Sequence, residues 1–306
     1  MSLDPQFRVV LDTLAGAGAT PLVRGDAADT RAHYRSLAMA RRGPGFVPEE
    51  VASVTDTHAG DVPVRVYEPA RGDGPVVVYL HGGGWVVGDV DTHDPVCRRV
   101  ANALAATVVS VDYRLAPEHP FPAGLDDAGT ALRWAADRHP GRALGVAGDS
   151  AGASLAAGLA LRAREAGPAL AGQLLFYPAT DPALAGGSIA ENGEGYFLTE
   201  SDMRWFYTQY LPAGDGSAPE LDLLHADVRG VAPAVVATAE FDPLRDEGAA
   251  YADRLRDAGV PVRYLPGPGL IHGYAAFLGA VDAAEDTVSA ALELFAELLS
   301  VRAQTA

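Results

Sequence analysis

The stretch Leu144-Gly145-Val146-Ala147-Gly148-Asp149-Ser150-Ala151-Gly152 joins two segments of different character. The apolar run up to Ala147 predicts a buried strand, and the small residues of 153–163 predict a buried helix that leaves it. A serine between two glycines at such a junction is held in a tight, strained turn, because the glycines let strand and helix cross closely. The Ser150 hydroxyl is therefore expected to stand above a sheet edge, where a catalytic nucleophile would lie.

Strand and helix patterns alternate along most of the chain. Nearly continuous apolar runs, which suit strands covered on both faces, occur at 76–80, 108–111, 174–177 and 235–238. Helical patterns occur from near Thr92, at about 126–137, directly after Ser150 and, with an inward apolar stripe, at 281–298. This alternation predicts an α/β fold in which helices flank a mostly parallel, doubly wound central sheet.

Three segments add to this alternating pattern. Val62, Val64 and Val66 alternate with Pro63 and Arg65, which predicts a half-buried edge strand. Residues 1–45 are helical and amphipathic, and 182–219 are rich first in glycine and then in aromatic residues. We expect 1–45 and 182–219 to form a helical cap over a core of 46–181 and 220–306, with some cap aromatics facing a pocket.

Composition limits the function classes. The 306 residues carry a net charge of −17, and all 23 basic residues are arginines, which argues against nucleic acid or an anionic membrane as a partner. The single cysteine, Cys97, excludes an internal disulfide and is expected to be a packing residue. With no signal-like N-terminus and no membrane-length apolar run, we expect a soluble cytoplasmic protein; a homodimer is left open.

One histidine has the setting of a catalytic base. His272 lies on a loop that follows the strand pattern at 260–265 and precedes a helix, and catalytic groups in this architecture occupy such loops. His93 and His119 also lie on loops, but nothing in the sequence places them near Ser150. The remaining histidines with no such setting are expected at the surface or in packing: His33, His58, His139 and His225.

The carboxylate that orients the base is expected at a strand end between Ser150 and His272. Asp242 follows the strand pattern at 235–238, whereas Asp246 and Glu247 occupy a first helical turn, where acidic residues are ordinary dipole partners. Asp242 is therefore the better candidate. Glu240 lies closer to the strand end, but it is interpreted as part of the turn and given no role.

A glycine-rich loop follows the strand pattern at 76–80. Gly82, Gly83 and Gly84 can expose backbone N–H groups there without obstructing side chains, and Ala151 supplies another N–H after the nucleophile. Such donors stabilise an oxyanion. His81 is expected to anchor this loop, with Gly82, rather than to act as a second base. No histidine–carboxylate cluster has metal-ligand spacing, so neither a metal nor a cofactor is expected.

Five motifs extend over nearly the whole chain: HGGGW at 81–85, YRLAPEHPFPA at 113–123, GDSAG at 148–152, DPLRDEG at 242–248 and HGY at 272–274. Together they resemble the bacterial hormone-sensitive-lipase family of carboxylesterases. The resemblance implies an α/β-hydrolase fold with a helical cap. It implies a catalytic triad of Ser150, His272 and Asp242. It also implies an oxyanion hole made by the N–H groups of Gly83, Gly84 and Ala151.

The resemblance is imperfect at two positions. Ala153 stands where the family commonly has a further glycine, and Tyr274 where it often has phenylalanine. Neither change removes a catalytic atom. The expected function is a serine carboxylesterase that hydrolyses small esters with short to medium acyl chains through an acyl-enzyme. The alternatives are a ligand-binding, receptor-like protein on the same fold, which the presence of His272 disfavours, and an amidase or peptidase.

Overall fold

The computed structural model describes residues 2–18, 20–42, 45–211 and 216–303. The strands are β1 (Ser53–Ala59), β2 (Val62–Glu68), β3 (Val76–Leu80), β4 (Thr107–Val111), β5 (Leu144–Asp149), β6 (Gly172–Phe176), β7 (Ala234–Ala237) and β8 (Val262–Leu265). The helices are α1 (Pro5–Gly16), α2 (Ala27–Arg41), α3 (Asp94–Leu104), α4 (Ala123–Arg138), α5 (Ala151–Ala166), α6 (Gly187–Asn192), α7 (Glu200–Tyr210), α8 (Arg245–Asp257) and α9 (Asp282–Ala303), with a short 3₁₀ helix η2 (Tyr274–Phe277).

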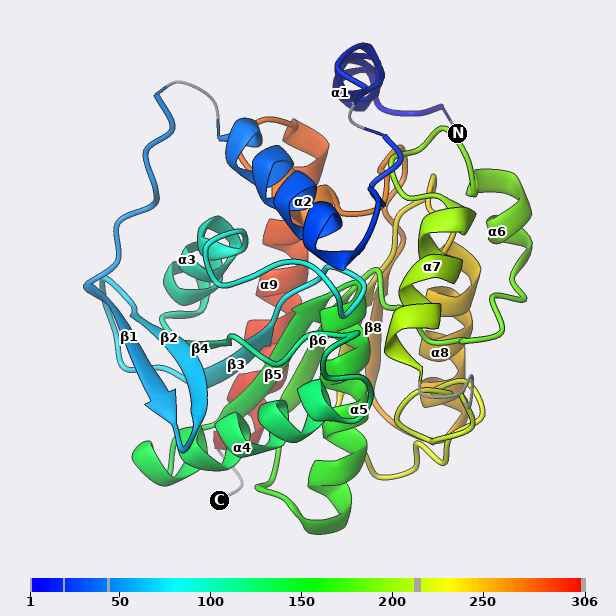
Figure 1. Cartoon of the computed structure of the whole chain (residues 1–306). Coiled ribbons are helices and arrows are strands. Elements are labelled where there is room, and N and C mark those ends of the chain that lie inside the picture. The colour runs from blue at the N-terminus through cyan, green and yellow to red at the C-terminus, as the bar shows by residue number, and fades with distance from the viewer. Residues whose placement is uncertain (1, 19, 43–44, 212–215, 304–306) are drawn as a thin grey trace.

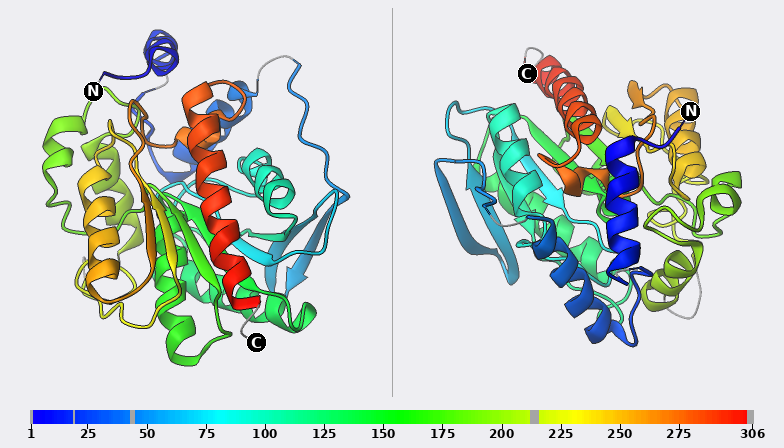
Figure 2. Two further views of the ribbon diagram at one scale, coloured as in Figure 1. Left: turned by 180° about the vertical axis from the view of Figure 1, so that it is seen from behind. Right: turned by 90° about the horizontal axis from the view of Figure 1, so that it is seen from above.

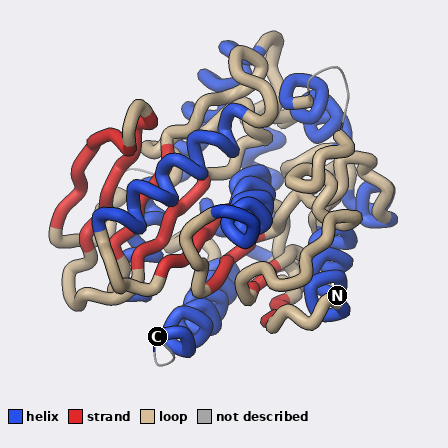
Figure 3. The backbone as a smooth tube through the Cα atoms, turned by 90° about the horizontal axis from the view of Figure 1, so that it is seen from below, coloured by secondary structure: helices blue, strands red, loops and turns tan. Residues whose placement is uncertain are grey.

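The strands form one mostly parallel sheet. Over the described residues it has eight strands in the order β1-β2-β4-β3-β5-β6-β7-β8. The central strands β3 to β6 are buried on both faces, as their continuous apolar runs predict. Helices cover both faces: α4 packs with α5, and α3 packs with α9. Figures 1 and 3 show the twisted strand layer between these helices. The predicted α/β architecture is confirmed.

The predicted edge strand is wrong in its position. Residues 62–68 form β2, which pairs antiparallel with both β1 and β4, so β1 is the edge. Most of β1 is exposed, and it therefore lacks the apolar alternation that marked β2. Pro63 fits inside the sheet because it lies at the start of β2, before the pairing with β4 begins at Val64.

Several helical predictions are confirmed. α5 is buried along almost its whole length and ends before Gly167. The stripe on α9 turns inward, and Phe295 at its centre is fully buried. Pro95 occupies the first turn of α3, where its missing N–H costs no hydrogen bond. No described helix is both long and apolar enough to cross a membrane.

The two segments predicted to form a cap supply α1, α2, α6 and α7. Residues 1, 19, 43–44 and 212–215 of these segments lie outside the described residues. Figures 1 and 2 show α1 and α2 over one end of the sheet, with α6 and α7 beside them. Two of the contacts that tie the segments together and to the core show how this is done. The N–H of Val23 donates to Asp202 of α7 at 3.1 Å, and Arg31 of α2 donates to the carbonyl of Val86 at 2.8 Å.

Candidate active site

Ser150 occupies a strained turn between β5 and α5. Its φ of +54° and ψ of −124° lie in a region that non-glycine residues rarely adopt. Gly152 permits the turn, because a Cβ there would collide with the carbonyl of Leu80 at the end of β3. The Ser150 N–H donates to the carbonyl of Phe176 at 2.8 Å, which fixes the turn against β6. The turn has the geometry that the sequence predicts.

A backbone bridge beyond the sheet brings Asp242 and His272 together. The loops after β7 and β8 meet where Phe241 and Ile271 form an isolated parallel bridge. The Phe241 N–H donates to the carbonyl of Leu270 at 2.9 Å. Asp242 and His272 each follow a bridged residue directly. Their side chains therefore start from neighbouring positions although thirty residues separate them in sequence.

Ser150, His272 and Asp242 form a continuous hydrogen-bonded chain. His272 Nδ1 lies 2.8 Å from Asp242 Oδ2, and His272 Nε2 lies 2.9 Å from Ser150 Oγ. Because a carboxylate only accepts hydrogen bonds, Nδ1 carries the hydrogen and Nε2 is free to accept from the serine hydroxyl. The Asp242 side chain is fully buried, and its other oxygen accepts from the N–H of Leu244 at 2.8 Å. The carboxylate is thus held rigidly behind the ring.

The other acidic residues near this loop have different partners. Asp246 accepts from the N–H of Ser188 at 2.8 Å and from Arg245 Nε at 2.8 Å. Glu247 is buried beneath the loop after β6, where burial raises its pKa well above the usual range. Glu240 accepts from the N–H of Gly269 at 2.8 Å. It therefore supports the loop that carries His272, a contact that sequence reasoning missed.

The loop after β3 presents backbone N–H groups to the same pocket as Ser150. Gly83 has φ of +127°, and a Cβ there would collide with the carbonyl of Val87, so this position requires glycine. Gly83, Gly84, Ser150 and Ala151 all line one pocket. Among the described residues, the N–H groups of Gly83, Gly84 and Ala151 donate no hydrogen bond. They are available to an oxyanion.

His81 lies beneath this loop rather than in the pocket. Its side chain is fully buried and stacks on Tyr113 at 4.3 Å between ring centroids, and Nδ1 lies 2.9 Å from the carbonyl of Gly82. Burial lowers the pKa of His81 to about 4, with a smaller contribution from His93. At neutral pH the ring is uncharged, which suits a packing role.

Asp149 and His93 also make contacts that sequence reasoning missed. The Asp149 carboxylate accepts from the Tyr79 hydroxyl at 2.8 Å and from the N–H of Gly82 at 3.0 Å, and it lies 3.4 Å from His93 Nε2. Burial by itself would raise the pKa of Asp149, but the favourable contacts with His93, Tyr79 and Gly82 lower it overall. Asp149 therefore links the serine turn to the glycine loop. The position of Asp149 directly before Ser150 is the sequence feature that could have indicated these contacts. His119, the other loop histidine considered in the sequence, is exposed in the structure.

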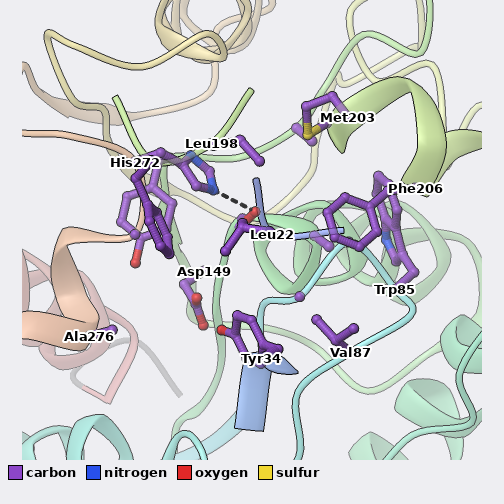
Figure 4. A pocket seen from close by; sticks show the side chains of 18 of the residues that line it. Leu22, Tyr34, Trp85, Val87, Asp149, Leu198, Met203, Phe206, His272 and Ala276 are labelled. Atoms are coloured by element: carbon purple, nitrogen blue, oxygen red, sulfur yellow. Dashed lines mark hydrogen bonds between the residues drawn. The ribbon is translucent and has the colours of Figure 1, made fainter. Parts of the chain in front are cut away.

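The pocket above Ser150 has a volume of about 580 Å³, open mouth included. Its walls are mostly apolar, and they come from the N-terminal segment, from the loop after β3 and from the region around α7. Figure 4 shows Met203 and Phe206 on one side of the pocket and His272 on the opposite side, with a dashed line for the hydrogen bond that His272 accepts from the Ser150 hydroxyl. The pocket is suited to a small, largely apolar ligand.

Comparisons with known proteins agree with the α/β-hydrolase fold of this chain. A family model described as alpha/beta hydrolase fold matches residues 77–276. Carboxylesterase NlhH of Mycobacterium tuberculosis is 42% identical over 95% of this chain and 94% of its own length. The ester hydrolase EH1AB1 from the metagenome of Lake Arreo, solved with a bipyridine phosphonate derivative, superposes with a TM-score of 0.87. It is 39% identical over 96% of this chain and 98% of its own.

A third relative comes from another domain of life. The esterase of the archaeon Pyrobaculum calidifontis superposes with a TM-score of 0.87 at 38% identity, over 98% of this chain and 99% of its own. The matches extend beyond the motif-bearing core to nearly the full chain. The chain belongs to the hormone-sensitive-lipase-like carboxylesterases of the α/β-hydrolase superfamily.

Proposed function

We propose that this chain is a serine carboxylesterase that hydrolyses small esters with short to medium acyl chains. The observation that carries the proposal is the hydrogen-bonded chain Asp242–His272–Ser150, which opens into an apolar pocket of limited volume. Residues 1–45 and 182–219 act as the cap that closes this pocket over the core. The ester nature of the substrate is also supported by the names of the relatives, which are carboxylesterases and ester hydrolases.

In the proposed mechanism, Ser150 Oγ attacks the acyl carbon while His272 Nε2 takes the hydroxyl proton. Asp242 stabilises the imidazolium that forms. The N–H groups of Gly83, Gly84 and Ala151 stabilise the negative charge on the former carbonyl oxygen. His272 then gives its proton to the departing alcohol, which leaves an acyl group on Ser150. Water attacks that acyl group with the same base and releases the acid.

The proposal is tested with the Ser150→Ala variant and p-nitrophenyl butanoate. We expect a loss of turnover of about a millionfold, as for other serine hydrolases, with the thermal unfolding midpoint preserved. The matched control is Ser154→Ala, one helical turn further along α5, which we expect to retain activity within severalfold. A fluorophosphonate should phosphonylate the wild type and Ser154→Ala only, with loss of fluoride, and mass spectrometry should detect the added phosphonyl group.

Two results would contradict this mechanism. Near-normal activity in folded Ser150→Ala would show that Ser150 is not the nucleophile. A wild type that binds esters without turnover would instead favour the ligand-binding alternative.

A further inference from the structure

Arg41, the last residue of α2, lies between two pockets. Its side chain lines the pocket above Ser150 and also an adjoining pocket of about 570 Å³, open mouth included. Asp149 and Ala276 are the other residues that line both. A group carried by a ligand in the first pocket can therefore reach the guanidinium of Arg41 without crossing the sheet.

The guanidinium of Arg41 has no acceptor on one edge. Its Nε and Nη2 atoms are shielded from solvent and have no hydrogen-bond partner, and no carboxylate lies within ion-pair distance among the described residues. The aromatic rings of Phe197 and Phe277 lie 4.9 and 4.7 Å from its central carbon, and the Tyr34 hydroxyl is its polar neighbour. The rings attract the charge, but they offer no in-plane lone pair to these N–H groups.

In two other arginines of this chain, the edge formed by Nε and Nη2 binds a carboxylate. Arg65 donates through Nε and Nη2 to Asp56 at 2.6 and 2.9 Å, and Arg114 donates through the same two atoms to Asp127. These two N–H groups are parallel and match the spacing of two carboxylate oxygens. In Arg41 the corresponding edge has no hydrogen-bond acceptor among the described residues.

A cation that is shielded from water along one edge and lacks a counter-charge is unfavourable, and a ligand that supplies the charge relieves this cost. Desolvation lowers the pKa of Arg41, yet a guanidinium remains protonated at neutral pH. Asp149 lines the same pockets, but its oxygens already contact Tyr79, Gly82 and His93. The net charge of −17 also repels free anions at long range, so any anion held here needs a direct contact.

We propose that Arg41 determines specificity by binding a carboxylate carried by the ester, so that the substrates include esters with an anionic group on the acyl or the alcohol side. This inference rests on the proposed esterase function. The contact is a hydrogen bond from the guanidinium to the carboxylate, and the Arg41 side chain must turn so that Nε and Nη2, which are shielded in this structure, face the pocket and donate to the two carboxylate oxygens. Arg41 is a binding residue in this scheme and takes no part in proton transfer.

Two pairs of substrates, each a carboxylate and its carboxamide isostere, test the proposal. On the acyl side, the pair is the mono-p-nitrophenyl ester of adipic acid and that of adipamic acid. On the alcohol side, it is m-carboxyphenyl butanoate and m-carbamoylphenyl butanoate. The measured quantity is the ratio of kcat/KM for the anionic member to kcat/KM for the neutral member, in wild type, Arg41→Met, Arg41→Lys and Arg35→Met. Arg35 lies on the same helix, is ion-paired with Asp89 and Asp91 and lines neither pocket, so its variant controls for the loss of a positive charge from α2 outside the pockets.

In at least one pair, we expect the ratio to fall by about tenfold to a hundredfold in Arg41→Met, to fall less in Arg41→Lys and to stay unchanged in Arg35→Met. An unchanged ratio in folded Arg41→Met for both pairs would overturn the inference while leaving the esterase proposal intact. If Arg41→Met does not fold, the wild type decides, because a preference for the neutral member in both pairs is incompatible with an anion-binding Arg41. A wild type that hydrolyses none of the four esters would refute the esterase proposal itself.

Discussion

Asp242 and Asp246 lie four residues apart, yet they face different parts of the molecule. Asp242 follows a bridged residue on the loop after β7 and contacts His272, whereas Asp246 is on α8 and contacts Ser188. The environments differ as well, since Asp242 is fully buried. The two carboxylates are therefore a matched pair for testing which one supports the base.

We expect Asp242→Asn to lower kcat by about four orders of magnitude, because an amide beside Nδ1 favours the wrong tautomer of His272. Asp246→Asn should remain within severalfold of the wild type. Parallel measurement of kcat for both variants with p-nitrophenyl butanoate checks this ranking. The reverse ranking would assign the orienting role to Asp246.

His81 should make the protein less stable in acid. Its pKa is about 4 in the fold and about 6.5 in an unfolded chain. Between these values the unfolded chain binds the proton more readily than the folded protein does. The contribution of His81 to the free energy of unfolding is therefore fully present above about pH 6.5 and is lost as the pH falls toward 4. The full effect is about 3 kcal/mol.

We therefore expect the free energy of unfolding of His81→Gln to vary less with pH over this window than that of the wild type. Urea unfolding at several pH values measures this dependence, and the exposed His225 provides a control in His225→Gln. Equal slopes for His81→Gln and wild type would contradict the assignment.

At the residue scale, the sequence predicts those site residues whose positions are marked by their neighbours in the chain. Ser150 lies between a strand and a helix, and Asp242 and His272 lie at strand ends, so each has a visible pattern. His93 and Arg41 have none, because their positions result from the packing of α3 and α2 against distant loops. Single-sequence patterns contain no information about such contacts.

At the scale of elements, the start of α7 is a junction. The Thr199 side chain accepts from the N–H of Asp202, and Asp202 accepts from the N–H of Thr199, which makes a capping box. Asp202 is almost fully buried and also accepts from the N–H of Val23 at 3.1 Å. One side chain thus both begins α7 and attaches the N-terminal segment to it.

We expect Asp202→Ala to lower the free energy of unfolding by about 2 kcal/mol or more, because it removes a cap and leaves a buried N–H unsatisfied. Glu200→Ala removes an acid from the same helical turn without these contacts and should change stability little. Urea denaturation of both variants makes the comparison. Equal effects would mean that the general charge at this helix end matters more than the Asp202 contacts.

Elements with buried, periodic sequences were predictable, and the exposed one was not. The apolar runs of β3 to β7 and the stripe of α9 arise because each faces the core. β1 is mostly exposed, and it is held by pairing with β2, for example Thr57 with Val64. Its residues therefore follow no apolar alternation. The alternation in β2 instead predicts an edge strand one position too far inside the sheet.

At the scale of the whole molecule, the pocket is enclosed by segments that are far apart in the chain. Leu22 and Tyr34 come from the N-terminal part, and Met203 and Phe206 come from α7. Trp85 of the glycine-rich loop stacks on Tyr210 at 4.4 Å between centroids, which fixes α7 over that loop. The enclosed volume is therefore limited by contacts between the two segments and the core.

We expect kcat/KM for p-nitrophenyl esters to rise with acyl length and then to fall within short to medium lengths. Each added methylene contributes about 0.8 kcal/mol until the pocket is full, and further ones must remain in water or displace the cap. The test is a series from acetate to palmitate, kept below the aggregation limit of each ester. A continuous rise through palmitate would indicate an open groove.

The bridge between Phe241 and Ile271 also determines which changes the active site can tolerate during evolution or engineering. Asp242 and His272 each follow a residue of this bridge directly. The position of each side chain is therefore set by its distance along the chain from the bridge. Substitutions in the two loops preserve this register. An insertion of one residue between the bridge and either side chain would shift Asp242 against His272 by a whole position. Libraries that diversify this region should therefore randomise residue identity and keep loop length constant.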